Sequence, residues 1–467
     1  MYCRRPVPPI PALHFLRSRR PEIALLLLGV VLRLAAIINL DPTWGYDSDG
    51  HYQYATWFVT HWAPPPINQF FQAFHPPFYY AIGGLILRAG GQFPALRAFS
   101  LFLGCVRLAL LWLGLELYLP GRRMARLLAM ALGAVLPVAL FMDATIGGEG
   151  LQNLLSVIAL ILAPLALRAR GRQRWRLAAW LGLVLGLCLL TKISGTALFI
   201  AIGMAVLAEQ FMSQNVSAAE RLGYAPPFAL SLAMALAISS PLLVRNMRVT
   251  GKPFPTSFDT IQANQQDSVK DTPVLDRRSL GYVFLGSWEI YSRPFWPTSI
   301  HPNPRFFPVL IAGTFGDYLN YGYAPRRTER PGDIISNVGP ARREALIPWR
   351  LSVVGGTVIA LMTFCCWLTS ARALWRRREV ERLPLLLAPP LAIAGLLYFT
   401  IAHPFDSEGV IKATYVQFGC APLYGLFGLA VESLWSRGPG GRVLAWIALV
   451  ALALVAVYTF FCRMLPL

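Results

Sequence analysis

The chain has 467 residues, a formal net charge of +19, 55% hydrophobic residues and only 14% charged residues. This balance excludes an ordinary soluble globular protein, and the long uninterrupted apolar runs exclude a β-barrel. The positive charge does not indicate a nucleic-acid-binding protein, because the arginines gather in short loops between apolar runs, the pattern that orients membrane-spanning helices. The sequence therefore predicts an all-α polytopic membrane protein.

About eleven apolar runs approach or reach the roughly 20 residues that cross the hydrocarbon of a bilayer. The predicted spans are 21–40, 95–118, 127–146, 151–167, 177–191, 195–212, 226–244, 350–370, 383–402, 412–434 and 441–461. In this topology every arginine-rich short loop lies on one side, so the N-terminus is predicted to be cytoplasmic. The first run has no small-residue cleavage site near its end and is predicted to be a retained anchor.

The predicted spans divide the chain into three regions. An N-terminal transmembrane module is followed by a long outer loop that can pack as a small cap, and then by the C-terminal transmembrane helices: 1–244, 245–348 and 349–467. The N-terminal module contains a first outer loop at 41–94. Within that loop, 50–62 is aromatic and amphipathic and 76–90 is apolar but short, so both are predicted to be interfacial helices at the membrane surface.

The first outer loop carries an unusual group of acidic and imidazole side chains. Asp47, Asp49 and His51 lie in the stretch GYDSDGHYQYA, and His75 opens the stretch HPPFYY. One interpretation is a solvated loop in which an aspartate caps the helix at 50–62. The other is a functional site at the mouth of the first span, which the two histidines and the many nearby aromatic residues favour.

A second acidic position is predicted at the same membrane boundary. Glu149 lies in the turn IGGEGLQ after the third span, and Asp143 lies about one helical turn deeper. A carboxylate within the hydrocarbon costs about 2.5–3.5 kcal/mol on insertion scales, so such residues usually face a cavity or the interior of a helix bundle. Glu149 and Asp47 are therefore predicted to converge on one site.

Five basic residues lie where they could serve either structure or function. Arg33 and Arg107 fall inside spans, where snorkelling or pairing with a carboxylate is the ordinary explanation. Lys192 lies between two apolar runs and could bind a phosphate or anchor the chain at the interface. Arg245 lies at the start of the long loop, and Arg293 lies in an aromatic patch within it. Each could neutralise a phosphate through charge-assisted hydrogen bonds.

These elements, in this order, resemble those of a known family. The elements are Arg33, Asp47 with His51, His75-Pro76-Pro77-Phe78-Tyr79-Tyr80, Gly148-Glu149-Gly150, Leu190 to Gly195, Arg245-Asn246 with Gly251-Lys252-Pro253, and Lys412-Ala413-Thr414-Tyr415. The chain is similar to the phospholipid-carrier-dependent glycosyltransferases of the GT-C fold, which include protein O-mannosyltransferases and aminoarabinose transferases. It departs from the family at Ser48, where a second acidic residue is usual, and Asp49 follows one position later.

The resemblance implies an inverting glycosyltransferase with a GT-C bundle. Asp47 would accept the proton of an acceptor hydroxyl that attacks the anomeric carbon of a polyprenyl-phosphate sugar. The departing phosphate would be stabilised by His75, Lys192, Arg245 or Arg293. Some GT-C enzymes use a divalent metal, and Asp47, Asp49, His51 and Glu149 could hold one, although their spacing does not commit the chain to it.

The implied partners are the lipid-linked sugar donor, membrane lipids and a glycan, lipid or protein acceptor. The composition, rich in Arg, Ala, Leu and Gly, suggests a bacterial inner membrane protein, with the site facing the periplasm. Two alternatives stay open. A transporter or flippase of a lipid-linked sugar would line a path with buried charges, but the two matching halves typical of transporters are not found in the sequence. A non-catalytic scaffold subunit would have dispensable carboxylates.

Overall fold

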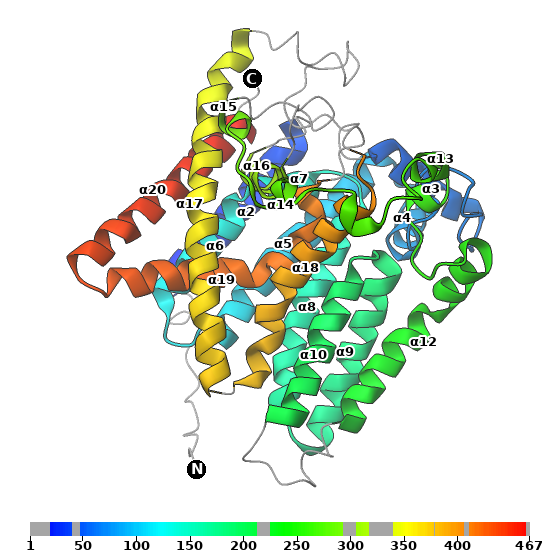
Figure 1. The fold of residues 1–467 in the computed structure, drawn as a ribbon, viewed down its shortest axis with the longest axis horizontal. Helices are drawn as coiled ribbons and strands as arrows, with labels where there is room; N and C mark the ends of the chain where they lie inside the picture. The colour runs from blue at the N-terminus through cyan, green and yellow to red at the C-terminus, as the bar shows by residue number, and fades with distance from the viewer. Residues whose placement is uncertain are drawn as a thin grey trace.

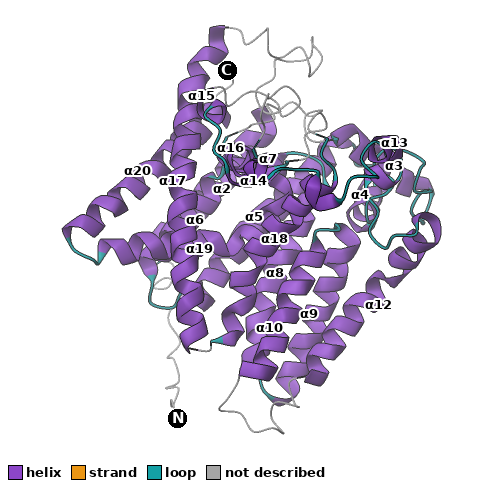
Figure 2. Cartoon of the chain, in the orientation of Figure 1, coloured by secondary structure: helices purple, strands orange, loops and turns teal. Residues whose placement is uncertain are grey.

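The computed structural model describes residues 19–39, 47–212, 225–292, 305–316, 340–377, 379–405 and 411–463. In these ranges every regular element is a helix (Figure 2). This agrees with the prediction of an all-α membrane protein. A helix closes its backbone hydrogen bonds within one segment, which is what the hydrocarbon of a membrane demands.

The long helices follow the predicted spans closely. They are α2 (Arg20–Asn39), α5 (Phe93–Tyr118), α6 (Arg123–Val135), α7 (Pro137–Ala144), α8 (Gly148–Arg168), α9 (Gly171–Thr191), α10 (Gly195–Met212), α12 (Ala225–Thr250), α17 (Pro340–Arg377), α18 (Leu383–Ala402), α19 (Gln417–Trp435) and α20 (Pro439–Arg463). Within the described residues, nine helices are long and apolar enough to cross a membrane, and the bent pair α6 and α7 makes ten. The shorter apolar helix α10 occupies the remaining predicted position.

The shorter elements gather mainly at one end of the bundle (Figure 1). They are α3 (Ser48–Thr60), α4 (Phe78–Arg88), η1 (Ser257–Asp259), α13 (Ala263–Asp267), η2 (Val274–Asp276), α14 (Leu280–Phe284), α15 (Glu289–Ser292), α16 (Phe306–Phe315), η4 (Val380–Arg382) and η6 (Ala413–Val416). The helices α3 and α4 pack on each other, near the predicted bounds of the two interfacial helices. Because α12 continues to Thr250 and α17 begins at Pro340, the predicted outer loop at 245–348 is shorter at both ends.

The body of the bundle is built from neighbouring helix pairs. The helix α9 packs between α8 and α12, and α17 packs along α20 (Figure 1). Small residues let some helices approach closely, as is usual in membrane bundles. A Cβ on Gly428 of α19 would lie only 2.0 Å from the carbonyl oxygen of Ala125 on α6, so glycine is required at that crossing.

The predicted span at 127–146 is present but is not continuous. The span is broken into α6 and α7, whose axes differ by 51°. Pro137 has no N–H to donate to the carbonyl of Gly133, and it disfavours the helical conformation at Leu136, which is extended with ψ near 118°. Arg33 of α2 supplies the missing donors, through hydrogen bonds of 3.3 Å to the carbonyl of Gly133 and 3.5 Å to that of Ala134.

The same arginine forms a buried ion-pair cluster at the centre of the bundle. Arg33 Nε and Arg107 Nη2 each lie 2.7 Å from Oδ2 of Asp143, which is fully buried on α7. The pairing predicted for the two arginines with a carboxylate is therefore confirmed. Gly104 makes room for the cluster, because a Cβ there would lie 2.2 Å from Cγ of Asp143. The cluster ties α2, α5 and α7 together beneath the short turn that precedes Glu149.

Candidate active site

Asp47 lies immediately before α3 in an uncommon backbone conformation. Its φ of 60° and ψ of 28° make it the one residue other than glycine with positive φ in the described part of the chain. The residue occupies the N-cap position of α3, but its side chain forms no capping hydrogen bond, so the interpretation of Asp47 as a helix cap is wrong. Its carboxylate is 40% exposed and lies 3.5 Å from Nζ of Lys412.

Asp49 and His51 point in different directions from the first turn of α3. Asp49 is exposed, and no described side chain forms an ion pair with it. His51 is buried, and its Nδ1 shares a hydrogen bond of 2.8 Å with the hydroxyl of Tyr80 on α4. Burial lowers the pKa of His51 below its ordinary value, although the carboxylates of Glu149 and Asp47 oppose this effect. His51 is therefore neutral at pH 7.

The HPPFYY stretch brings three parts of the site together. The ring of His75 lies 5.8 Å from that of His51, between centroids. Tyr80 holds His51, and the hydroxyl of Tyr79 accepts a hydrogen bond of 3.2 Å from the backbone N–H of Gly147, in the turn before α8. Burial and the nearby Lys192 ammonium keep the pKa of His75 well below its ordinary value, so His75 also offers a neutral ring.

The second carboxylate of the site is held by a lysine. Glu149 lies in the first turn of α8, and its Oε1 is ion-paired with Nζ of Lys192, which ends α9. Nζ of Lys192 lies 4.4 Å from the ring centroid of Tyr415, and Nζ of Lys412 lies 5.7 Å from the same centroid. The two ammonium groups thus flank one aromatic ring, each beside its own carboxylate, an arrangement that also gains from cation–π attraction.

The remaining predicted residues lie apart from this cluster. Arg245 on α12 donates hydrogen bonds of 3.0 Å to the carbonyl of Pro65 and 3.4 Å to that of Ala73, two residues before His75. It therefore docks the loop that carries His75 onto α12. Arg293 lies outside the described residues.

Lys412 is the member of the site to which the sequence assigned no role. It stands in the KATY element, which enters the sequence analysis only through the family resemblance. A signal was present, since the chain has just four lysines, Lys192, Lys252, Lys270 and Lys412, and two of them meet at Tyr415. Nothing in the sequence places the start of η6 beside α3.

The acidic and imidazole groups do not form a metal centre as they are placed. Among the residues that the structure describes, no group of three or more His, Cys, Asp or Glu side chains could hold a metal ion. Of the three carboxylates predicted as possible ligands, Asp47 and Glu149 each face a lysine ammonium, and Asp49 is exposed on the first turn of α3. A bound ammonium already supplies the positive charge that a metal would bring, so the donor set does not fit a divalent ion.

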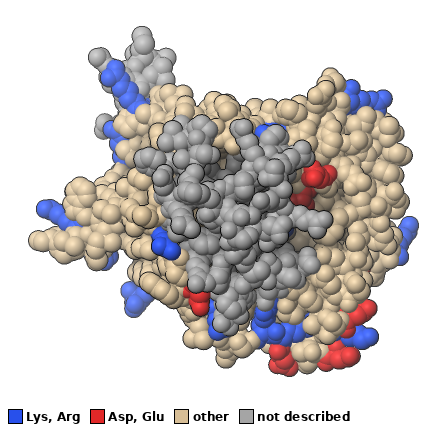
Figure 3. All heavy atoms as spheres, turned by 90° about the horizontal axis from the view of Figure 1, so that it is seen from above, with Lys and Arg blue, Asp and Glu red and all other residues tan. Residues whose placement is uncertain are grey.

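The surface at this end of the bundle is mostly uncharged. Seen from above, its described part shows acidic side chains in only a few small groups (Figure 3). The carboxylate of Asp47 is exposed, and it lies beside a lysine that is largely buried.

Residues 51–268 match a family model described as a predicted membrane protein (DUF2142). No curated protein matches the chain. Among solved structures, the apo oligosaccharyltransferase of Archaeoglobus fulgidus superposes with a TM-score of 0.54 at 16% identity, over 95% of this chain and 56% of that chain. The same enzyme in complex with Zn and sulfate gives 0.52 at 16% identity, over 94% and 53%.

The chain has the GT-C fold. It spans about half the length of the oligosaccharyltransferase that it matches. ArnT from Cupriavidus metallidurans in the apo state is also similar, with a TM-score of 0.39 at 16% identity over 90% of this chain and 79% of that chain. The predicted fold class, a GT-C bundle of membrane helices, is confirmed.

Proposed function

We propose that the chain is a membrane glycosyltransferase that moves a sugar from a polyprenyl-phosphate donor to an acceptor hydroxyl, with inversion at the anomeric carbon. The observation that carries the proposal is the exposed Asp47 carboxylate, which lies beside Lys412. The ammonium groups of Lys412 and Lys192 both lie near the ring of Tyr415. A base and a phosphate-binding pair thus lie together. The GT-C fold, shared with an oligosaccharyltransferase, supports the same conclusion.

In the proposed reaction the acceptor oxygen forms a bond to the anomeric carbon as its proton passes to Asp47. The bond between the anomeric carbon and the phosphate oxygen breaks, and its electron pair leaves with the polyprenyl phosphate. Asp47 becomes neutral as it takes the proton, which weakens its hold on Lys412. The ammonium of Lys412 then becomes available to the phosphate at the moment when the phosphate gains charge.

Other residues have supporting roles in this proposal. Lys192, whose ammonium lies 4.4 Å from the ring centroid of Tyr415, also stabilises the phosphate, and Glu149 holds that lysine in place. His75 donates a hydrogen bond from its neutral ring to the departing phosphate. Arg245 positions the loop of His75 through the carbonyl of Ala73. Asp49, which is exposed on the first turn of α3, is the second candidate for the base.

The deciding experiment measures the release of polyprenyl phosphate from a panel of polyprenyl-phosphate sugars by the purified protein in lipid nanodiscs, with membrane extract as a source of acceptors. Wild type is compared with Asp47→Asn, which keeps the size of the side chain and tolerates positive φ. The matched control is Asp276→Asn, an exposed aspartate on η2.

Release from one donor by wild type and the control, but not by Asp47→Asn, supports the proposal and identifies the sugar. Equal release by all three proteins would assign the base role to Asp49. If no donor releases its carrier, the transferase proposal fails. A transport assay with the same donors in sealed vesicles then tests the alternative of a flippase.

A further inference from the structure

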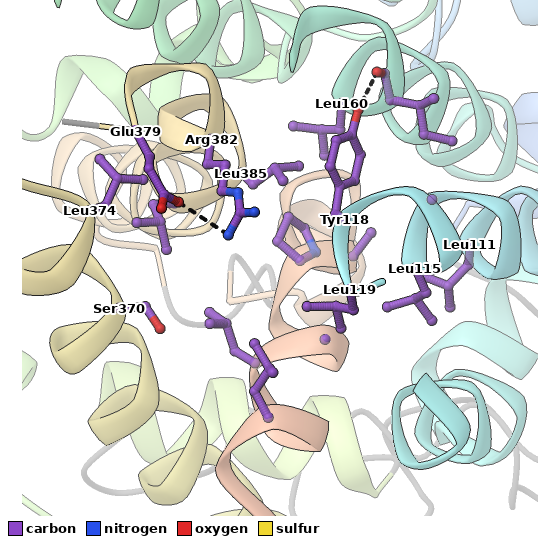
Figure 4. A pocket seen from close by; sticks show the side chains of 18 of the residues that line it. Leu111, Leu115, Tyr118, Leu119, Leu160, Ser370, Leu374, Glu379, Arg382 and Leu385 are labelled. Atoms are coloured by element: carbon purple, nitrogen blue, oxygen red, sulfur yellow. Dashed lines mark hydrogen bonds and ion pairs between the residues drawn. The ribbon is translucent and has the colours of Figure 1, made fainter. Parts of the chain in front are cut away.

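A cavity that none of the candidate active-site residues lines lies within the bundle (Figure 4). It measures about 240 Å³, is partly open to the surface of the bundle, and is lined by α5, α8, α17, η4, α18 and α19. The helix α18 begins at this cavity with Leu385 and Leu386 and ends at Ala402, just before the stretch that leads to Lys412. Because 20 residues of helix extend about 30 Å, the start of α18 lies far from the site, whereas Val157, eight residues after Glu149 on α8, lies on the wall of the cavity nearer to it.

The walls of the cavity require an apolar occupant. They are formed mainly by leucines, with glycine and alanine between them, and Figure 4 shows Leu111 and Leu115 on one side and Leu374 on the other. Apolar walls hold water poorly. The cavity is therefore expected to be filled by hydrocarbon.

The helices on both sides of the cavity face lipid. On α5, Leu113 and Leu117 are 52% and 44% exposed, and on α17, Leu368 and Trp375 are 48% and 69% exposed. In a helix bundle of this class, exposed apolar side chains along a span contact acyl chains of the bilayer. An acyl chain can therefore enter between α5 and α17 without first crossing water.

The rim of the cavity carries a surplus of positive charge. Arg382 and Arg377 line it together with one acid, Glu379, which lies 3.2 Å from Arg382 and 3.9 Å from Arg377. Nε of Arg382 has no hydrogen-bond partner, so its guanidinium can still take an acceptor after a small rotation. Phosphate oxygens are strong acceptors for a guanidinium.

We propose that this cavity binds one acyl chain of an anionic membrane phospholipid, whose phosphate is held at the rim by Arg382. The lipid fills the seam between α5 and α17 and stabilises the bundle at that end. This role is independent of the glycosyltransferase proposal, since none of the candidate active-site residues lines the cavity. It would hold equally if the chain were a transporter.

The test is lipid binding measured by native mass spectrometry on the full-length protein, delipidated in detergent and titrated with phosphatidylglycerol or phosphatidylcholine. Ala373→Phe fills the cavity from an exposed lining position on α17 and keeps every charge. Arg382→Gln removes the rim charge. The matched control is Arg372→Gln, which changes an exposed arginine of α17 that does not line the cavity.

Wild type and Arg372→Gln are expected to bind one phosphatidylglycerol about fivefold more tightly than phosphatidylcholine, the effect of roughly one basic residue at an anionic lipid. Arg382→Gln should lose this preference, and Ala373→Phe should lose tight binding of both lipids while it stays monodisperse. Unchanged binding by Ala373→Phe would overturn the cavity as the binding site. Equal binding of both lipids by wild type would overturn the role of Arg382. Binding of free glycerol phosphate as tightly as of the lipid would show that no acyl chain is needed, which also refutes the proposal.

Discussion

The ammonium of Lys412 lies 3.5 Å from the carboxylate of Asp47, although the two residues stand near opposite ends of the chain. A second pair, Lys192 with Glu149, lies beside the ring of Tyr415, which Lys412 also approaches. The site therefore holds two positive and two negative charges that balance each other. Under the proposed function, an incoming phosphate would meet two ammonium groups that their carboxylates already hold in place.

The first prediction concerns Lys412. Replacement by methionine keeps the length of the side chain and removes its charge, so carrier release should fall about 10²-fold, the usual cost of one preorganised donor to a developing anion. Lys412→Arg should recover part of the rate, because it restores the positive charge but spreads it over a planar guanidinium instead of a compact ammonium. Lys270→Met, at an exposed lysine of the outer segment, is the matched control and should match wild type. Full activity in Lys412→Met would remove Lys412 from the mechanism.

The second prediction concerns metal removal. The carboxylates of Asp47 and Glu149 each face a lysine, and the described residues offer no cluster of three metal ligands. Carrier release should therefore change less than about twofold after treatment with EDTA, a difference well below 1 kcal/mol in the barrier. The oligosaccharyltransferase with the same fold has been solved in complex with Zn, so the effect of EDTA on this chain tests a difference between the two proteins. Loss of activity in EDTA that Mn²⁺ or Mg²⁺ restores would contradict the prediction.

Sequence reasoning predicted the fold well because apolar run length is a local property. It missed the break at Leu136 and Pro137, since a proline within a span can kink, break or merely bend it, and the outcome depends on whether Arg33 can reach the freed carbonyls. For the site, sequence reasoning named Asp47 and Lys192, because acidic residues and lysines are rare in this chain and these two lie at the ends of apolar runs. The role of Lys412 was beyond it, because the contact with Asp47 is set only by the packing of distant helices.

The third prediction concerns pH and His403, which follows the end of α18. Its Nδ1 lies 2.8 Å from Oε1 of Gln266, and its ring stacks on Phe258. Burial lowers the pKa of His403 to about 4, with Asp259 opposing the shift. An unfolded histidine has a pKa of about 6.5. The unfolded state therefore binds a proton between about pH 6.5 and 4 while the folded state does not.

The stability that depends on neutral His403 is fully present above pH 6.5 and is lost as the pH falls toward 4. His403→Gln cannot titrate, so its melting temperature should fall less than that of wild type between pH 7.5 and 5.0. Buried His51 and His75 act in the same direction in both proteins and cancel in the comparison. Parallel pH profiles for the two proteins would show that His403 does not contribute.

The fourth prediction concerns the buried cluster of Asp143 with Arg33 and Arg107. Asp143→Asn leaves two guanidinium groups inside the bundle without a counter-charge, which should cost about 3–5 kcal/mol in the free energy of unfolding. Arg107→Met should cost less, because Asp143 keeps its contact with Arg33. The double variant Asp143→Asn with Arg107→Met should be less destabilised than the sum of the single variants, since the two residues contact each other.

Arg33→Met separates the charge of the cluster from its second role. It leaves Asp143 with Arg107, but it exposes the carbonyls of Gly133 and Ala134 to an apolar interior without a donor. We therefore expect Arg33→Met to be more destabilising than Arg107→Met, although both remove one arginine from the same carboxylate. Unfolding in mixed micelles with increasing SDS measures the difference. Equal destabilisation by the two variants would mean that the freed carbonyls at the break between α6 and α7 do not depend on Arg33.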